Sequence, residues 1–146
     1  MATTANTQVP NVELIDRAQS VLNPQHIQGR LFGNVAADLV TDSGRHYSGV
    51  CIDTGSGTGF CAEAAAISAM VTAGEQRIIK IVAVWRDDAG TLFVLPPCGR
   101  CREFIRQMDE SNMDTGVVLG RDLTAPLRDL LPFNSWPEPL PMDDSP

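Results

Sequence analysis

The stretch IIKIVAVW, residues 78–85, is a dense run of β-branched and aliphatic side chains, which is typical of a strand buried on both faces. The alanine-rich run CAEAAAISAMVTA, residues 61–73, precedes it and predicts a helix that ends at Gly74. Beyond the strand, residues 98–108 read as a second helix with apolar side chains along one face. A buried strand between two helices predicts an α/β fold.

The other predicted elements follow from apolar side chains at helical spacing or in short runs bounded by turn residues. They are a helix over 12–22, a hairpin of strands 31–40 and 47–52, strands over 91–95 and 115–119, and a short helix over 125–131. This order predicts a three-layer α/β/α sandwich with a mixed sheet. We expect one domain, residues 11–133, with a disordered N-terminus, residues 1–10, and a proline-rich tail, residues 134–146.

The charge of the chain favours one class of partner over another. It has 11 Lys and Arg residues against 18 Asp and Glu, a formal net charge of −7. Binding a nucleic-acid polymer requires clustered basic residues, and no basic run is present, so a small-molecule substrate is favoured. No apolar run approaches the ~20 residues of a membrane span. The N-terminus lacks the apolar segment of a secretion signal, so we expect a cytoplasmic protein.

Three of the four cysteines lie in two short motifs, Cys61-Ala62-Glu63 and Pro97-Cys98-Gly99-Arg100-Cys101. A catalytic zinc site needs three protein ligands and one open position, and Cys61, Cys98 and Cys101 provide the three. Both motifs open predicted helices, whose N-termini lower thiol pKa values and stabilise thiolates. Glu63 lies close enough to act as the acid/base group beside the open position, where zinc lowers the pKa of a water molecule.

Other interpretations of the cysteines remain open. A Cys-x-x-Cys pair alone can be redox-active, and a structural zinc site would need a fourth ligand. Cys51 is the main candidate for that ligand; it is otherwise a buried thiol or a substrate-facing residue. His26 and His46 lack ligand spacing and are interpreted as surface histidines. A zinc-stabilised binding module without catalysis is the alternative to an enzyme.

The two motifs resemble those of the zinc-dependent cytidine deaminase superfamily, including its blasticidin S deaminase branch. The resemblance spans roughly residues 12–132, and the stretch VAADLVTDSGRHYSG at residues 35–49 and the Leu-Leu-Pro at residues 130–132 support it. It implies a sheet of about five strands, one Zn²⁺ per chain, and a homotetramer. It also implies hydrolytic deamination of a free cytosine nucleoside to the uracil nucleoside, with Glu63 as the proton shuttle.

This chain departs from the family at residues that are expected to contact the substrate. An Asn-x-Glu that holds the sugar hydroxyls in cytidine deaminases is replaced by Cys51-Ile52-Asp53. Because a site built to hydrogen-bond a hydroxyl loses rate when its polar groups change, the substrate could be cytidine, deoxycytidine or a modified aminopyrimidine. Blasticidin S deaminases share the Cys-Gly-Arg-Cys seen here. Cys51 and Asp53 are the candidates for substrate contact, although Asp53 could instead cap the following loop.

The resemblance implies further substrate contacts. Phe32 corresponds to the family's base-stacking phenylalanine, although its spacing to Val35 is about one residue longer, and core packing is its alternative role. The backbone N–H of Ala62 can meet the pyrimidine carbonyl from the helix start. Phe133 and Trp136 could form an aromatic wall, but in a proline-rich tail such residues more often pin the tail to the domain.

Two arginines are candidates for balancing the charge of the thiolates. In three-cysteine family members an arginine follows the catalytic glutamate, but this chain has Ala64 there. Arg100 and Arg102, beside the second zinc motif, are expected to compensate for the excess negative charge of three thiolates. The alternative for Arg100 is a solvated helix side chain.

Overall fold

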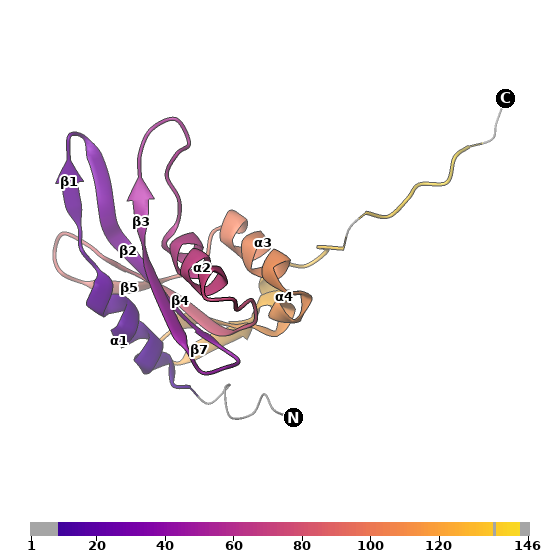
Figure 1. Cartoon of the computed structure of the whole chain (residues 1–146), viewed down its shortest axis with the longest axis horizontal. Helices are drawn as coiled ribbons and strands as arrows, with labels where there is room; N and C mark the ends of the chain where they lie inside the picture. The colour runs from indigo at the N-terminus through magenta and orange to yellow at the C-terminus, as the bar shows by residue number, and fades with distance from the viewer. Residues whose placement is uncertain (1–8, 136, 144–146) are drawn as a thin grey trace.

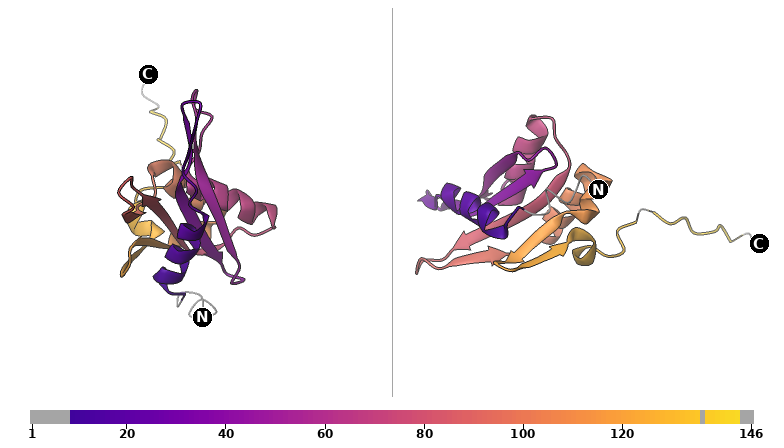
Figure 2. Two further views of the ribbon diagram at one scale, coloured as in Figure 1. Left: turned by 90° about the vertical axis from the view of Figure 1, so that its left-hand side faces the viewer. Right: turned by 90° about the horizontal axis from the view of Figure 1, so that it is seen from below.

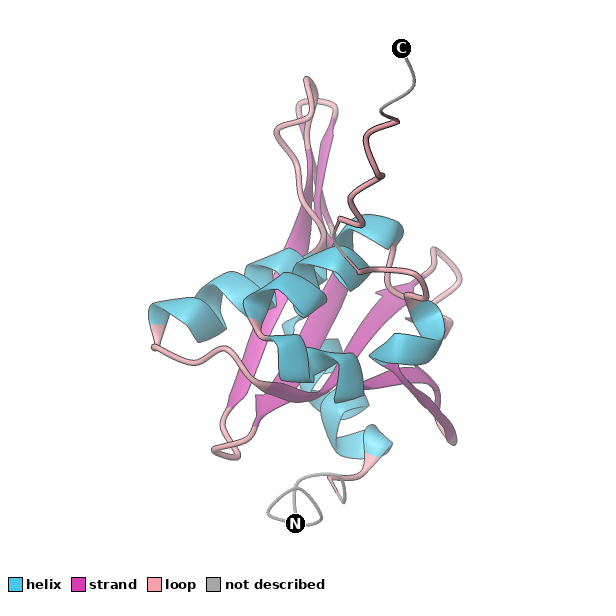
Figure 3. Cartoon of the chain, turned by 90° about the vertical axis from the view of Figure 1, so that its right-hand side faces the viewer, coloured by secondary structure: helices cyan, strands magenta, loops and turns pink. Residues whose placement is uncertain are grey.

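The computed structural model describes residues 9–135 and 137–143. In chain order its helices and strands are α1 Asn11–Val21, β1 Gln25–Ile27, β2 Arg30–Thr41, β3 His46–Asp53, α2 Ala62–Thr72, β4 Ile78–Arg86, β5 Leu92–Leu95, α3 Gly99–Met108, the 3₁₀ helix η1 Glu110–Asp114, β6 Gly116–Gly120, β7 Leu123–Pro126 and α4 Leu127–Leu130. Helix α1 covers one face of the sheet, and α2, α3 and α4 lie over the other (Figures 1 and 3). This arrangement confirms the three-layer α/β/α sandwich.

Strand β4 is the centre of the sheet, as its composition predicts. Residues 78–84 are all buried. Along one edge β4 pairs antiparallel with β2, and along the other it pairs parallel with β6 and antiparallel with β5. Strand β3 extends the sheet beyond β2, and β7 extends it beyond β6. A strand with neighbours on both edges and helices on both faces is mostly apolar, because little of it meets water. The charged residue of the buried segment, Lys80, donates from Nζ to the Val9 carbonyl and to Oδ1 of Asn11.

Two hydrophobic cores fill the spaces between the layers, and the alternation along β2 divides its side chains between them. Ala37 and Leu39 pack in the core beneath α2 and α3. Ala36 and Val40 pack in the core beneath α1. The left view of Figure 2 shows α1 and α2 on opposite sides of the β2–β3 hairpin.

His46 is not a surface residue as the sequence had suggested. Its side chain is only 11% exposed, and its Nδ1 lies 2.7 Å from Oδ2 of the fully buried Asp38. The Ser48 hydroxyl donates to the other carboxylate oxygen of Asp38. Burial raises the pKa of Asp38, although the hydrogen bonds from His46 and Ser48 act in the opposite direction. His26, by contrast, is exposed in β1.

Within the described residues the sheet has seven strands, against the expected five or so. The two that sequence patterns missed are β1 and β7, which are short and lie at the ends of the sheet order. Ala125 was predicted to lie in the last helix, but it pairs with Val117 as part of β7. Helix α4 therefore begins only at Leu127. Both errors arise because pairing with a neighbouring strand, rather than local periodicity, decides the conformation of these segments.

The chain beyond α4 leaves the domain as an extended segment (Figure 1). Phe133, Leu140 and Met142 are exposed. Phe133 therefore does not pin the tail to the domain, and Trp136 lies outside the described residues, as does most of the predicted N-terminal segment. Within the described ranges, no helix combines the length and apolar character that crossing a membrane requires.

Candidate active site

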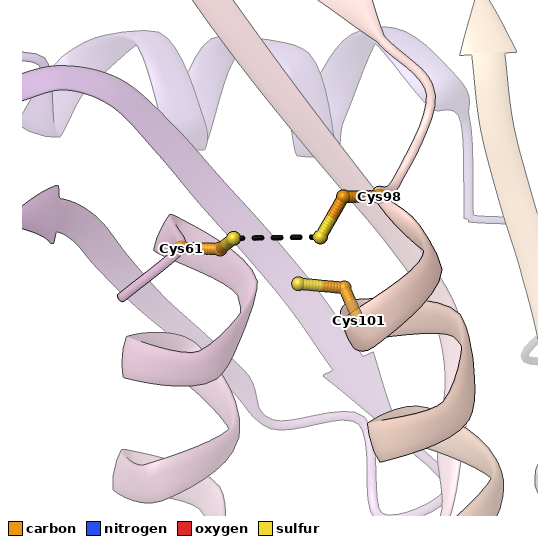
Figure 4. Close-up of side chains that lie close together, drawn as sticks. All are labelled: Cys61, Cys98 and Cys101. Carbon is orange, nitrogen blue, oxygen red and sulfur yellow. Dashed lines mark hydrogen bonds between the residues drawn. The ribbon is translucent and has the colours of Figure 1, made fainter. Parts of the chain in front are cut away.

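The three cysteines of the two motifs converge at the starts of two helices (Figure 4). Cys61 immediately precedes α2, Cys98 immediately precedes α3, and Cys101 lies in the first turn of α3. The Sγ atoms of Cys61 and Cys98 are 3.5 Å apart. All three sulfur atoms lie within 4.8 Å of one another. The sequence-predicted ligand set is therefore brought together by the fold.

Two features of the backbone hold Cys61 and α2 in place. Ile52, in β3, exchanges backbone hydrogen bonds with Phe60, the residue before Cys61. Helix α2 also packs directly on β3 at Gly49, where an added Cβ would lie 2.5 Å from the backbone nitrogen of Ala66. Helix and strand approach this closely only because position 49 has no side chain.

The donor set fits a catalytic zinc ion. Zn²⁺ is bound tetrahedrally by thiolates at about 2.3 Å, which places two of its sulfur ligands about 3.8 Å apart. Among the described residues, no fourth His, Cys, Asp or Glu belongs to the cluster. Cys51 is not a ligand in this arrangement, because its thiol donates to Oδ1 of Asn34 at 2.9 Å. A site with three protein ligands leaves one coordination position open, which distinguishes a catalytic zinc from a structural one.

The ionisation of the three thiols explains why they need a cation. Burial raises the pKa of Cys101 strongly, and burial together with the Cys98 thiol raises that of Cys61. Burial also acts to raise the pKa of Cys98, but hydrogen bonds from the Cys101 backbone and from both other thiols outweigh it and lower the pKa. The predicted stabilisation of thiolates at helix starts is thus seen in only one of the three. A bound Zn²⁺ would favour the thiolate form of all of them.

Glu63 lies in the first turn of α2 and is only 6% exposed. Burial raises the pKa of its carboxyl group, although hydrogen bonds from its own backbone N–H and the Cys101 thiol act in the opposite direction. A raised pKa brings a carboxyl group closer to the pH at which it can act as a general acid and base. Glu63 also lines the cavity beside the cysteine cluster.

The cavity in front of the cysteines has a volume of about 480 Å³. Its walls come from the bulged part of β2, the end of β3, the glycine-rich loop after β3, the starts of α2 and α3, and single residues of β4 and β5. The predicted site residues that line it are Cys51, Asp53, Cys61, Ala62, Glu63, Cys98 and Arg100. Residues that the sequence did not single out also line it, including Asn34, Val35, Phe60 and Leu95.

Two predicted site residues, Phe32 and Arg102, belong neither to the cavity wall nor to the cysteine cluster of the described structure. Phe32 is half-buried in β2 but is not among the residues that line the cavity. A bulge in β2 after Phe32 brings Asn34 and Val35 to the cavity wall instead. The one-residue difference in spacing between Phe32 and Val35 was the sequence signal of this bulge.

The two arginines differ in their surroundings. Arg100 is exposed and lines the cavity next to Cys98. Arg102 donates from Nε to the Pro97 carbonyl at 2.9 Å and from Nη1 to the Leu130 carbonyl at 3.0 Å. These contacts give Arg102 a role in joining α3 to the segment before it and to α4. Of the two, Arg100 is therefore the stronger candidate for compensating the charge of the thiolates.

Comparison with known proteins relates this site to one family. The sequence profile described as the cytidine and deoxycytidylate deaminase zinc-binding region matches residues 13–117. A search of curated protein sequences found no significant match. The crystal structure of cytidine deaminase from Mycobacterium tuberculosis is similar with a TM-score of 0.68 and 27% identity, over 84% of this chain and 94% of that one. Cytidine deaminase from Mycobacterium leprae is similar with a TM-score of 0.67 and 25% identity, over 83% of this chain and 96% of that one. The chain therefore belongs to the cytidine and deoxycytidylate deaminase family, and it is a zinc-binding hydrolytic deaminase.

Proposed function

We propose that this protein deaminates a free cytosine nucleoside, of the cytidine or deoxycytidine type, to the uracil nucleoside. The observation that carries the proposal is that the nearly buried Glu63 lines the same cavity as Cys61 and Cys98, two residues of the sulfur cluster. The similar solved structures are cytidine deaminases, which supports the choice of substrate class. The cavity volume of about 480 Å³ is in the range of small-molecule sites.

The reaction replaces the amino group of the pyrimidine by oxygen. When bound by Cys61, Cys98 and Cys101, Zn²⁺ supplies a Lewis acid that activates water for attack. Glu63 accepts a proton from the attacking water, delivers a proton to the ring nitrogen next to the amino-bearing carbon, and then protonates the departing amino group. The carbon–nitrogen bond breaks as a carbon–oxygen bond forms, and one water is consumed for each ammonia released.

Other groups of the cavity orient the substrate. The backbone N–H of Ala62, at the start of α2, would donate to the pyrimidine carbonyl, because the first N–H groups of a helix have no partner within it. Cys51 and Asp53 would contact the part of the substrate that extends from the base. The stacking of Phe32 on the base remains a prediction. Phe32 is not among the residues that line the cavity.

The charge of the zinc centre involves Arg100. Three thiolates and one Zn²⁺ carry a net charge of −1, which weakens the metal as a Lewis acid. Arg100, beside Cys98 at the cavity wall, would offset this charge. Assembly into a homotetramer and a cytoplasmic location also remain predictions, and light scattering of the purified protein would test the first.

The experiment that tests the proposal follows the loss of cytosine-type ultraviolet absorbance with zinc-loaded protein. The substrates are cytidine, deoxycytidine and blasticidin S, and the control variant is Glu63→Gln. We expect turnover of cytidine or deoxycytidine, and a loss of at least about 100-fold in kcat for Glu63→Gln with one zinc per chain retained. Turnover of blasticidin S alone would replace the proposal by a resistance-type deaminase. Absence of turnover on all three would refute the nucleoside assignment.

A further inference from the structure

A bulge in β2 places a carboxamide in the wall of the active-site cavity. The pairing of β2 with β3 shifts register between Phe32 and Ala36. Within this bulge Gly33 has φ +70, and an added Cβ there would lie 2.4 Å from the carbonyl oxygen of Asn23. Position 33 therefore requires glycine. The bulge brings Asn34 to the cavity wall.

A thiol from the neighbouring strand fixes the orientation of this carboxamide. Cys51 of β3 donates its S–H to Oδ1 of Asn34 across 2.9 Å. A carboxamide has one oxygen acceptor and two N–H donors, so this contact occupies the acceptor and leaves the donors. Among the described residues, Nδ2 of Asn34 has no hydrogen-bond partner. The side chain is half-buried, and its N–H groups are therefore available to an acceptor in the cavity.

An anionic acceptor lines the same cavity as this donor. Asp53 is two residues beyond Cys51 in β3, so both side chains lie on the same face of the strand, about 7 Å apart along it. Asp53 also lines the cavity and is exposed, whereas Glu63 at the cysteine cluster is 6% exposed. The cavity thus combines the nearly buried Glu63 with an amide donor, Asn34, and an exposed carboxylate acceptor, Asp53, that come from the two strands.

We propose that Asn34 is a specificity-determining residue that donates from Nδ2 to a hydroxyl oxygen on the sugar of the substrate, while Cys51 holds its amide in place. Asp53 accepts a hydrogen bond from a sugar hydroxyl on the same side. A hydroxyl group is both donor and acceptor, so a pair of neighbouring hydroxyls matches an amide donor beside a carboxylate acceptor. The pyrimidine carbonyl group can only accept hydrogen bonds, so it cannot pair with the Asp53 carboxylate, which is also an acceptor. This inference rests on the proposed nucleoside deamination.

The test compares substrates that differ only in their hydroxyl groups. Asn34→Ala should lower kcat/KM for cytidine about 10-fold, the effect of one lost hydrogen bond, and change kcat/KM for 2′,3′-dideoxycytidine less than about threefold. Asn34→Asp, which keeps the shape and loses both N–H donors, should show the same selective loss. The matched control Asn23→Ala, at an exposed position whose side chain is outside the cavity, should leave both values unchanged. Equal losses on both substrates, or no loss on either, would overturn the proposal.

The thiol is tested separately as a positioning group. Cys51→Ser keeps a donor to Oδ1 of Asn34 and should therefore keep most of the preference for cytidine over 2′,3′-dideoxycytidine, whatever its overall rate. Cys51→Ala removes the donor and should reproduce part of the selective loss seen with Asn34→Ala. Equal activity of Cys51→Ala and the wild type on cytidine would overturn the positioning role of the thiol. Zinc content and thermal unfolding of each variant identify those that fail to fold.

Equilibrium binding separates this inference from the proposed function. Calorimetric titration of zinc-loaded protein with the same two nucleosides, in the Glu63→Gln background, should show tighter binding of cytidine than of 2′,3′-dideoxycytidine, and Asn34→Asp should remove the difference. If wild-type protein binds in this way without turnover, the proposed function fails and the inference stands. If turnover is normal but Asn34 has no effect, the inference fails alone. If no nucleoside binds, both fail.

Discussion

The sulfur atoms of Cys61 and Cys98 lie 3.5 Å apart, although 37 positions separate the two residues along the chain. This distance is far longer than a disulfide bond of about 2.05 Å and close to the separation of about 3.8 Å between two thiolates on one tetrahedral zinc ion. The cysteines are free. The geometry thus favours metal binding over the redox role that a Cys-x-x-Cys sequence also allows.

Zinc content should depend on each ligand of the cluster. Cys101→Ser removes a sulfur that is buried behind the cavity, and we expect the zinc content to fall from one per chain to nearly none, with loss of turnover. Cys51→Ser is the matched control and should retain its zinc, because the Cys51 thiol is bonded to Asn34 rather than to the cluster. Elemental analysis of dialysed protein measures both. A full zinc complement in Cys101→Ser would contradict the three-ligand site.

Gly49→Ala should weaken both the fold and the active site. The new methyl group would overlap the backbone of α2 at Ala66, so the helix that carries Glu63 must move away from β3. We expect the free energy of unfolding to fall by about 1–3 kcal/mol, the usual effect of overpacking, together with a lower kcat. Urea unfolding and steady-state kinetics measure the two effects. Gly55→Ala, where an added Cβ meets nothing within 4 Å, is the control and should change neither.

Arg100→Gln should weaken the zinc centre without unfolding the protein. Loss of the guanidinium of a residue that lines the cavity leaves the negative charge of the thiolates uncompensated, and we expect kcat to fall about 10-fold and zinc to be lost at lower chelator concentration. Chelator competition and kinetics at saturating zinc measure these changes. Arg121→Gln, at an exposed position in the turn between β6 and β7, is the control. Unchanged zinc retention and turnover in Arg100→Gln would leave this arginine as a solvated side chain.

Stability in acid should depend on Glu75, which follows α2. Its carboxylate accepts hydrogen bonds from the hydroxyls of Ser43, Tyr47 and Thr41, and these bonds lower its pKa below the ordinary 4.5. A lowered folded-state pKa means that the stabilisation is fully present above about pH 4.5 and is lost as the pH falls through the folded-state value. Urea unfolding from about pH 7 to about pH 3 should therefore show a smaller decline for Glu75→Gln than for the wild type. Parallel profiles for the two proteins would contradict this assignment.

Sequence patterns predicted well those helices and strands whose own residue types determine where in the fold they can be buried. Apart from Lys80, residues 78–84 are apolar on both faces of the strand, and the centre of the sheet is the position that buries them all. The two helices that present the cysteines were predicted because alanine favours helix and because apolar residues three or four positions apart form one face of a helix. By contrast, Ala125 joins a strand only because the edge of β6 is available to it.

The sequence by itself predicted the chemistry of the site. Cys61, Glu63, Cys98 and Cys101 lie at the starts of predicted helices, and their residue types predict a zinc site with a general acid–base group. Tertiary structure alone decided which side chains complete the cavity. Asn34 reaches the wall because a bulge changes the register of β2, and a one-residue change of register moves a side chain to the other face of a strand. The His46 side chain is only 11% exposed and contacts Asp38, which lies opposite Ser48 in the hairpin, a contact that no local pattern records. Local periodicity reports what each segment can bury, whereas register and close approach between segments decide what each side chain meets.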